Sequence, residues 1–245
     1  RADVFSPGEL ARAHQALEGL TQCTRCHVAG EQLSGERCLE CHGELRGSIT
    51  RGRGLHGRLP AAERAACEGC HHEHQGRDFA LVDWGPAGRK AFDHARTGFE
   101  LRGKHRRTDC ARCHDRRLVQ DPAVTDLLGK QPGRVTYLGA ATACATCHFD
   151  EHRGQLGADC QRCHAEETWK PARGFQHART AYPLAGKHAR VACAKCHAPE
   201  PEATPRAAAP AQTAPVNAAA FVRYKGKPFQ ACTDCHKDPH QGRFG

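Results

Sequence analysis

The chain has 245 residues, and 36 Lys and Arg against 27 Asp and Glu give it a formal net charge of +9. Leu, Ile, Val and Phe together make 35 residues, too few to bury the apolar surface that would offset the entropy lost when such a chain is ordered. The composition therefore excludes a conventional apolar core, and no apolar run approaches the roughly 18 residues that a membrane-spanning helix needs.

The first predicted element is a helix near the start of the chain. Ser6 fits an N-cap, Pro7 the first helical position and Glu9 the closing position of a capping box. We expect this helix to run to about Gly19 and to carry His14. Beyond it, 25 Gly and 14 Pro interrupt nearly every periodic run, so short helices, long irregular connections and almost no strand are expected.

All 16 cysteines belong to Cys-x-x-Cys-His motifs, of which there are eight. The cysteines are Cys23, Cys26, Cys38, Cys41, Cys67, Cys70, Cys110, Cys113, Cys144, Cys147, Cys160, Cys163, Cys193, Cys196, Cys232 and Cys235. The histidines that close the motifs are His27, His42, His71, His114, His148, His164, His197 and His236. An isolated Cys-x-x-Cys also fits a zinc knuckle or a redox dithiol. Histidine is only 18 of 245 residues, so its recurrence after all eight pairs is not accidental.

The motif is the signature of covalent c-type haem attachment. Two thiols one short turn apart can each add to a vinyl group of one porphyrin, while the next imidazole reaches the iron. Eight haems are therefore expected, and no cysteine remains for a disulfide. They would supply the missing apolar mass, so the polypeptide is expected to wrap around a chain of stacked haems. Plain disorder, the other account of this composition, does not explain the ordered spacing.

Haem also changes the interpretation of the charge. Each ferric haem carries about −1 with its propionates, so eight would bring the total to about +1. The basic runs at 104–107 and 116–117 are then expected to pair with propionates or to be solvated. With 6% aromatic residues and no binding motif, nucleic acid is not an expected partner. Residues 52–57 fit Gly-x-Gly-x-x-Gly, but no strand precedes them, so they predict a loop instead of a nucleotide site.

The sixth ligand of each iron must come from the remaining side chains. Methionine is absent, so histidine–methionine ligation is excluded and bis-histidine ligation is expected throughout. Nine histidines are candidates: His14, His56, His74, His94, His105, His152, His177, His188 and His240. The tenth, His72, is the weakest because it directly follows His71. A second histidine is also surplus, with His56 and His240 the least supported of the nine.

Internal repeats organise the chain. The element Phe-x-His…Gly-Lys-His-x4-Cys-x-x-Cys-His runs from Phe92 to His114 and recurs 83 residues later from Phe175 to His197. We expect two diverged four-haem halves, 1–125 and 126–245. The second would comprise residues 126–197, an Ala/Pro-rich linker at 198–220 and a single-haem module at 221–245. The linker fits either a surface loop on its own protein or an arm that packs on a neighbouring subunit.

The eight motifs, the methionine-free ligand set and the repeated element resemble the multihaem c-type cytochromes related to the class III low-potential cytochromes. More narrowly, the chain is similar to octahaem cytochromes of metal-reducing bacteria, over nearly its whole length. The resemblance implies low-potential bis-histidine haems stacked into a wire. Such a wire carries electrons through the periplasm, across the outer membrane within a β-barrel porin, or along an extracellular filament. The Ala/Pro-rich insert departs from the family pattern.

Electron transfer between other redox proteins, and no enzymatic activity, is the function expected from this ligand set. Multihaem enzymes that convert nitrite, hydroxylamine or tetrathionate keep an open iron, sometimes with Cys-x-x-Cys-Lys, and no such variant occurs here. A polymeric filament built from copies of this chain is a further alternative. Because c-type haem is attached outside the cytoplasm, we expect a periplasmic, outer-membrane-associated or extracellular protein whose signal peptide has been removed before Arg1.

Overall fold

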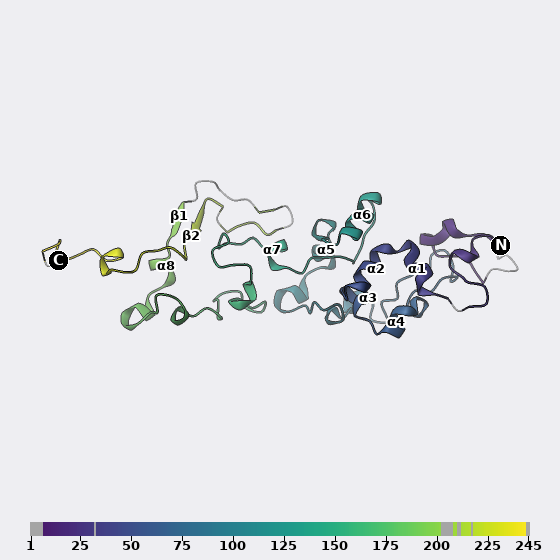
Figure 1. Ribbon diagram of the computed structural model, residues 1–245, viewed down its shortest axis with the longest axis horizontal. Helices are drawn as coiled ribbons and strands as arrows, with labels where there is room; N and C mark the ends of the chain where they lie inside the picture. The colour runs from purple at the N-terminus through teal and green to yellow at the C-terminus, as the bar shows by residue number, and fades with distance from the viewer. Residues whose placement is uncertain (1–6, 32, 202–207, 210–211, 217, 244–245) are drawn as a thin grey trace. The chain divides into compact units, whose positions relative to one another are not determined.

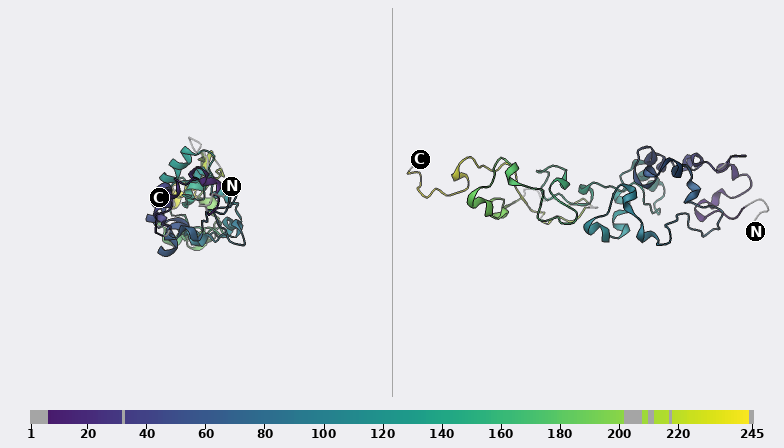
Figure 2. Two further views of the ribbon diagram at one scale, coloured as in Figure 1. Left: turned by 90° about the vertical axis from the view of Figure 1, so that its right-hand side faces the viewer. Right: turned by 90° about the horizontal axis from the view of Figure 1, so that it is seen from below.

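The computed structural model describes residues 7–31, 33–201, 208–209, 212–216 and 218–243. These residues are mostly irregular, with short helices joined by long connections (Figures 1 and 2). The only sheet among them has two short strands. The expected fold class of irregular chain with short helices and almost no β-structure is confirmed.

The α-helices have between four and nine residues. They are α1 Gly35–Cys41, α2 Gly43–Thr50, α3 Gly54–Arg58, α4 Ala61–Ala65, α5 Cys110–Cys113, α6 Pro122–Lys130, α7 Cys144–Cys147 and α8 Cys193–Cys196. The 3-10 helices are η1 Arg12–Leu17, η2 Cys23–Arg25, η3 Cys67–Gly69, η4 Arg89–Ala91, η5 His94–Thr97, η6 Gly103–Arg107, η7 Arg116–Leu118, η8 Cys160–Arg162, η9 His177–Arg179, η10 Gly186–Arg190 and η11 Cys232–Asp234. Every Cys-x-x-Cys-His motif therefore begins in a helical turn.

The predicted helix from Ser6 to Gly19 is wrong in its extent and type. Its Ser6 cap lies outside the described residues, and the only helix in the rest of this range is the 3-10 helix η1. Gly8 has a φ of +151°, which no helix allows, and its carbonyl accepts a hydrogen bond from His74 Nδ1 at 3.0 Å. A contact with a residue 66 positions away thus overrides the local capping signal.

The described chain divides into two compact lobes that interleave in sequence. Lobe 1 comprises Arg1–Leu101 and Val119–Ala140, and lobe 2 comprises Arg102–Leu118 and Ala141–Gly245. In lobe 1, α2 packs against α1, α3 and α6. Helix α6 begins where the Asp121 side chain accepts hydrogen bonds from the N–H groups of Ala123 and Val124, with Pro122 at the first helical position.

Very little apolar side-chain surface is buried. Among the described residues the buried hydrophobic side chains are those of Ala11, Val124 and Leu128 in lobe 1 and Leu118 in lobe 2. The buried polar residues are Glu44 and Ser48, one turn apart on α2. No helix in the described part of the chain is long and apolar enough to cross a membrane.

The two strands bracket the Ala/Pro-rich segment in lobe 2. Strand β1 (Pro199–Pro201) pairs antiparallel with β2 (Ala220–Val222), as Figure 1 shows. The described part of the segment between them lies against residues near α7: the Thr213 N–H donates to the carbonyl of Cys147 at 2.8 Å, and the Val216 N–H donates to Glu151 at 2.6 Å. These are the contacts of a surface loop on its own protein.

Candidate functional site

All eight Cys-x-x-Cys-His motifs adopt the same hydrogen-bonded turn. In each, the histidine N–H donates to the carbonyl of the first cysteine, at 2.8 to 2.9 Å. This bond from residue i+4 to residue i closes one helical turn and places the two cysteines, three positions apart, on the same side of it. The two cysteines of each motif are therefore neighbours on one side of the turn.

The thiols of neighbouring motifs lie close enough to affect one another. None of the 16 cysteines forms a disulfide. In lobe 1, burial and, to a smaller extent, the adjacent Cys67 thiol together raise the pKa of Cys38 to about 11. In lobe 2, burial raises the pKa of Cys147, and nearby Cys113 adds to the effect. In these two cases, motifs that follow one another in the chain are thus also neighbours within their lobe.

Seven of the eight attachment histidines face a second histidine. The ring centres in these histidine pairs are 5.9 to 6.3 Å apart. The pairs are His14 with His42, His27 with His74, His56 with His71, His105 with His148, His152 with His164, His177 with His197, and His188 with His236. Each pair joins one histidine that closes a motif to one that does not.

This separation fits two imidazoles on opposite sides of one metal ion. A metal–imidazole bond of about 2.0–2.1 Å and about 1.2 Å from ring nitrogen to ring centre, taken twice, give about 6.4 to 6.6 Å, slightly more than the observed separations. Each pair offers two donors, and the described residues include no group of three or more His, Cys, Asp or Glu side chains arranged to hold a metal by themselves. Each histidine pair by itself could therefore supply two ligands to a metal ion.

The candidate ligands fall into two sets. Seven of the nine lie in the pairs above: His14, His56, His74, His105, His152, His177 and His188. His56, one of the least supported from sequence, faces His71 at 6.1 Å. Burial, with a smaller effect of His71, lowers the pKa of His56, which favours the neutral imidazole that binds metals. His72 is exposed, and its ring lies 6.5 Å from that of Phe79.

The other two candidates are His94 and His240, for which we describe contacts other than a histidine pair. The ring of His94 lies 5.2 Å from that of Phe92. The loop that carries His240 has the same hydrogen bonds as the loop that carries His152. The Asp238 carboxylate accepts from the N–H groups of His240 and Gly242 at 2.8 and 2.6 Å, as Asp150 does for its own loop at 2.9 and 2.6 Å. The His-x-Gly sequence after the motif thus corresponds to one backbone structure.

Hydrogen bonds fix the orientation of many of these rings. Backbone carbonyl oxygens lie within hydrogen-bonding distance of Nδ1 in several of them, for example Leu81 with His71 at 2.7 Å, Trp169 with His164 at 2.8 Å and Arg223 with His197 at 2.9 Å. With Nδ1 occupied, Nε2 is the nitrogen left for a metal. The indole ring of Trp169 also stacks on the imidazole of His164, with centres 4.1 Å apart.

Carboxylates occupy the same position on four other histidines, and none of these contacts was expected from the sequence analysis. Glu73 contacts Nδ1 of His14 at 2.5 Å, and Glu166 contacts Nδ1 of His105 at 2.9 Å. These partners are 59 and 61 residues apart in sequence, so no local pattern could reveal them. The other two, Glu44 with His42 at 3.3 Å and Asp150 with His152 at 3.2 Å, are two residues apart and could have been considered.

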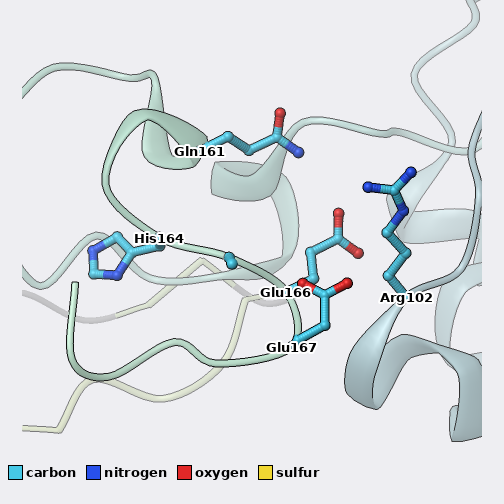
Figure 3. A pocket seen from close by; sticks show the side chains of 6 residues that line it. Arg102, Gln161, His164, Glu166 and Glu167 are labelled. Carbon is cyan, nitrogen blue, oxygen red and sulfur yellow. The ribbon is translucent and has the colours of Figure 1, made fainter. Parts of the chain in front are cut away.

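A hollow of about 230 Å³ lies beside His164 in lobe 2. It is lined by Arg102, Gln161, His164, Ala165, Glu166 and Glu167, and Figure 3 shows the two glutamate side chains pointing toward the side from which Arg102 enters. Glu166 thus lies both at this hollow and against His105. The hollow therefore lies next to His164 of one histidine pair and next to Glu166, which contacts His105 of another pair.

No protein-family model, curated protein or solved structure matches the chain. The case for its function therefore depends on its own residues.

Proposed function

We propose that the protein transfers electrons through eight covalently attached c-type haems, each with its iron between two histidines. The observation that supports this most is the set of seven histidine pairs at 5.9 to 6.3 Å, each containing one histidine of a Cys-x-x-Cys-His motif. Sequence spacing alone does not require a second histidine opposite each motif. A metal held between the two rings explains both the motif and the pairing.

A porphyrin accounts for the donor set better than zinc does. A structural zinc site takes four protein ligands, usually from cysteine and histidine. A porphyrin supplies four equatorial nitrogens, so the protein needs only the two axial donors that each pair offers. Both cysteines of a motif are then used for attachment, which also explains why 16 thiols form no disulfide. A redox dithiol leaves the facing histidines unexplained.

The repeated element predicts the ligand of the eighth haem. In its second copy, His177 faces His197 of the same copy and His188 faces His236 of the following motif. In its first copy, His105 likewise faces His148 of the following motif. The correspondence therefore assigns His94 to the iron of the Cys110 motif. His72 and His240 are then the two surplus histidines.

The haems would also form the interior of the protein. Four buried hydrophobic side chains in the described residues are far too few for a 245-residue core. Eight porphyrins, each gripped by two thioethers and two imidazoles, would bury the apolar surface instead. We propose that the polypeptide wraps around them.

Haem iron supplies reversible one-electron chemistry when bound. The two histidines of each pair would both bind the iron of a haem held there, so an iron held by such a pair would have no position left for a substrate. Two imidazole ligands also favour a low reduction potential. The residues therefore suit electron transfer between other redox proteins, in an exported protein that works in the periplasm, with an outer-membrane porin or in a filament.

The proposal is tested by maturing the chain in a host that attaches c-type haem. We expect an intact mass equal to the polypeptide plus eight haems, and a ferric spectrum in which all the iron is low-spin. The mass of the bare polypeptide, or zinc in place of iron, would contradict haem attachment. A substantial high-spin fraction in the native protein would instead favour an enzyme with an open iron.

A further inference from the structure

One histidine pair differs from the others in the groups that contact its rings. His14 and His42 both have a carboxylate at Nδ1: Glu73 Oε1 lies 2.5 Å from the first and Glu44 Oε1 lies 3.3 Å from the second. Both carboxylates belong to lobe 1. Of the seven pairs, this is the one in which carboxylates contact both rings.

The structure holds both carboxylates in place. The second oxygen of Glu73 accepts a hydrogen bond from the Ala11 N–H at 2.8 Å, so both carboxylate oxygens have a partner. Glu44 lies on the first turn of α2 with its side chain 7% exposed, and Arg134 is 3.9 Å from the oxygen that contacts His42. Because Arg134 competes for that oxygen and its distance to the ring is longer, Glu44 is expected to act more weakly than Glu73.

The other pairs have fewer carboxylates or none. Among the described residues, Glu166 contacts His105 but no carboxylate contacts its partner His148, and Asp150 contacts His152 whereas its partner His164 has a backbone carbonyl. His74 and His71 are oriented by backbone carbonyls. The pairs therefore form a series with two, one or no carboxylates.

A carboxylate that accepts the Nδ1 proton makes an imidazole a stronger electron donor at Nε2. A stronger donor stabilises ferric iron more than ferrous iron, because the ferric ion carries the larger positive charge. The added electron is then held less tightly, and the reduction potential falls. The effect is larger where the carboxylate is shielded from water, as at Glu44 and Glu73.

We propose that the iron between His14 and His42 has the lowest reduction potential in the protein, and that Glu73 and Glu44 are the residues that set it. This inference rests on the proposed function. During reduction this iron accepts its electron last, and during oxidation it loses its electron first. Glu73 and Glu44 are positioning residues that act through the ligands and do not contact iron.

The test is an optical redox titration of the haem-loaded protein and of two variants, Glu73→Gln and Glu44→Gln. Glutamine keeps the size of the side chain but removes its negative charge. We expect the last step of reduction to move to higher potential, more for Glu73→Gln than for Glu44→Gln. A tenfold loss in the preference for ferric over ferrous iron corresponds to about 59 mV for one electron. One low-spin ferric signal of the eight should change in the electron paramagnetic resonance spectrum.

Glu63→Gln is the matched control, because Glu63 is an exposed glutamate on α4 in the same lobe. It removes one charge without touching a histidine pair, and its titration should coincide with that of the parent protein. An unmoved last step in both variants, or an equal shift in the control, would overturn the inference. Mass and low-spin spectrum are measured first, so that loss of haem from the parent protein is recognised as failure of the proposed function. If Glu73→Gln does not mature, Glu44→Gln tests the same iron from its other side.

Discussion

At the scale of single residues, the histidines near the Cys67 motif show that the ring facing a motif histidine need not come from a neighbour in sequence. His71 closes the motif, and His72 follows it directly in sequence. Yet the ring that faces His71 is that of His56, which comes from α3 and lies outside every repeated pattern. Sequence proximity is thus a poor guide to which histidine serves a given site.

This difference gives a paired prediction. His56→Ala should leave one of the eight irons without its second histidine, because only water or a vacancy could then replace the imidazole. That iron should become high-spin, visible as a new charge-transfer absorption band in the ferric protein. His72→Ala should leave the spectrum unchanged. A fully low-spin His56→Ala protein would show that another side chain ligates this iron.

The residue types at the site could be predicted from sequence, but their partners could not. The absence of methionine and the surplus of histidine were enough to expect bis-histidine ligation. The internal repeats suggested most of the candidate histidines. The pairing of His27 with His74, or the contact of Glu73 with His14, depends on how segments more than 40 residues apart come together. No periodicity in the chain encodes such contacts.

At the scale of elements, the short helices follow directly from sequence, whereas the ends of the insert do not. Frequent Gly and Pro limit every helix to a few turns, and each motif forms its own turn. The pairing of β1 with β2 was not expected, because Pro199 and Pro201 are unusual in a strand. An edge position in a two-stranded sheet tolerates them, since the free side of the strand needs no N–H donor.

The paired ends of the insert predict that it can be removed. Replacing residues 202–218 with a short Gly-containing turn should leave haem content and the oligomeric state unchanged, because β1 and β2 already lie side by side. Intact mass and light scattering measure the two properties. A change in oligomeric state would contradict the surface-loop interpretation and support an arm that reaches a neighbouring subunit.

At the scale of the whole molecule, the described residues bury few apolar side chains. The composition forecast the scarcity of buried apolar residues, because Leu, Ile, Val and Phe make only 35 of 245 residues. It could not forecast the two interleaved lobes, since the segment Arg102–Leu118 leaves one lobe and Val119–Ala140 returns to it. Such exchanges depend on tertiary contacts that no local signal marks.

Without haem, the protein should not fold. Material made in a compartment that lacks haem attachment should give the far-ultraviolet circular dichroism of a disordered chain and no cooperative thermal transition, because the remaining apolar contacts cannot offset the ordering entropy. The haem-loaded protein is the control. A cooperative transition in the haem-free chain would show that the polypeptide has a core of its own.

The turn shared by the eight motifs has a consequence for biogenesis. Its closing hydrogen bond, from the histidine N–H to the first cysteine carbonyl, lies within five consecutive residues and needs nothing from the rest of the chain. Each turn can therefore form while the nascent polypeptide is still extended, before any lobe exists. Under the proposed function, haem attachment at one motif therefore need not wait for the others, because all eight motifs present the same local turn.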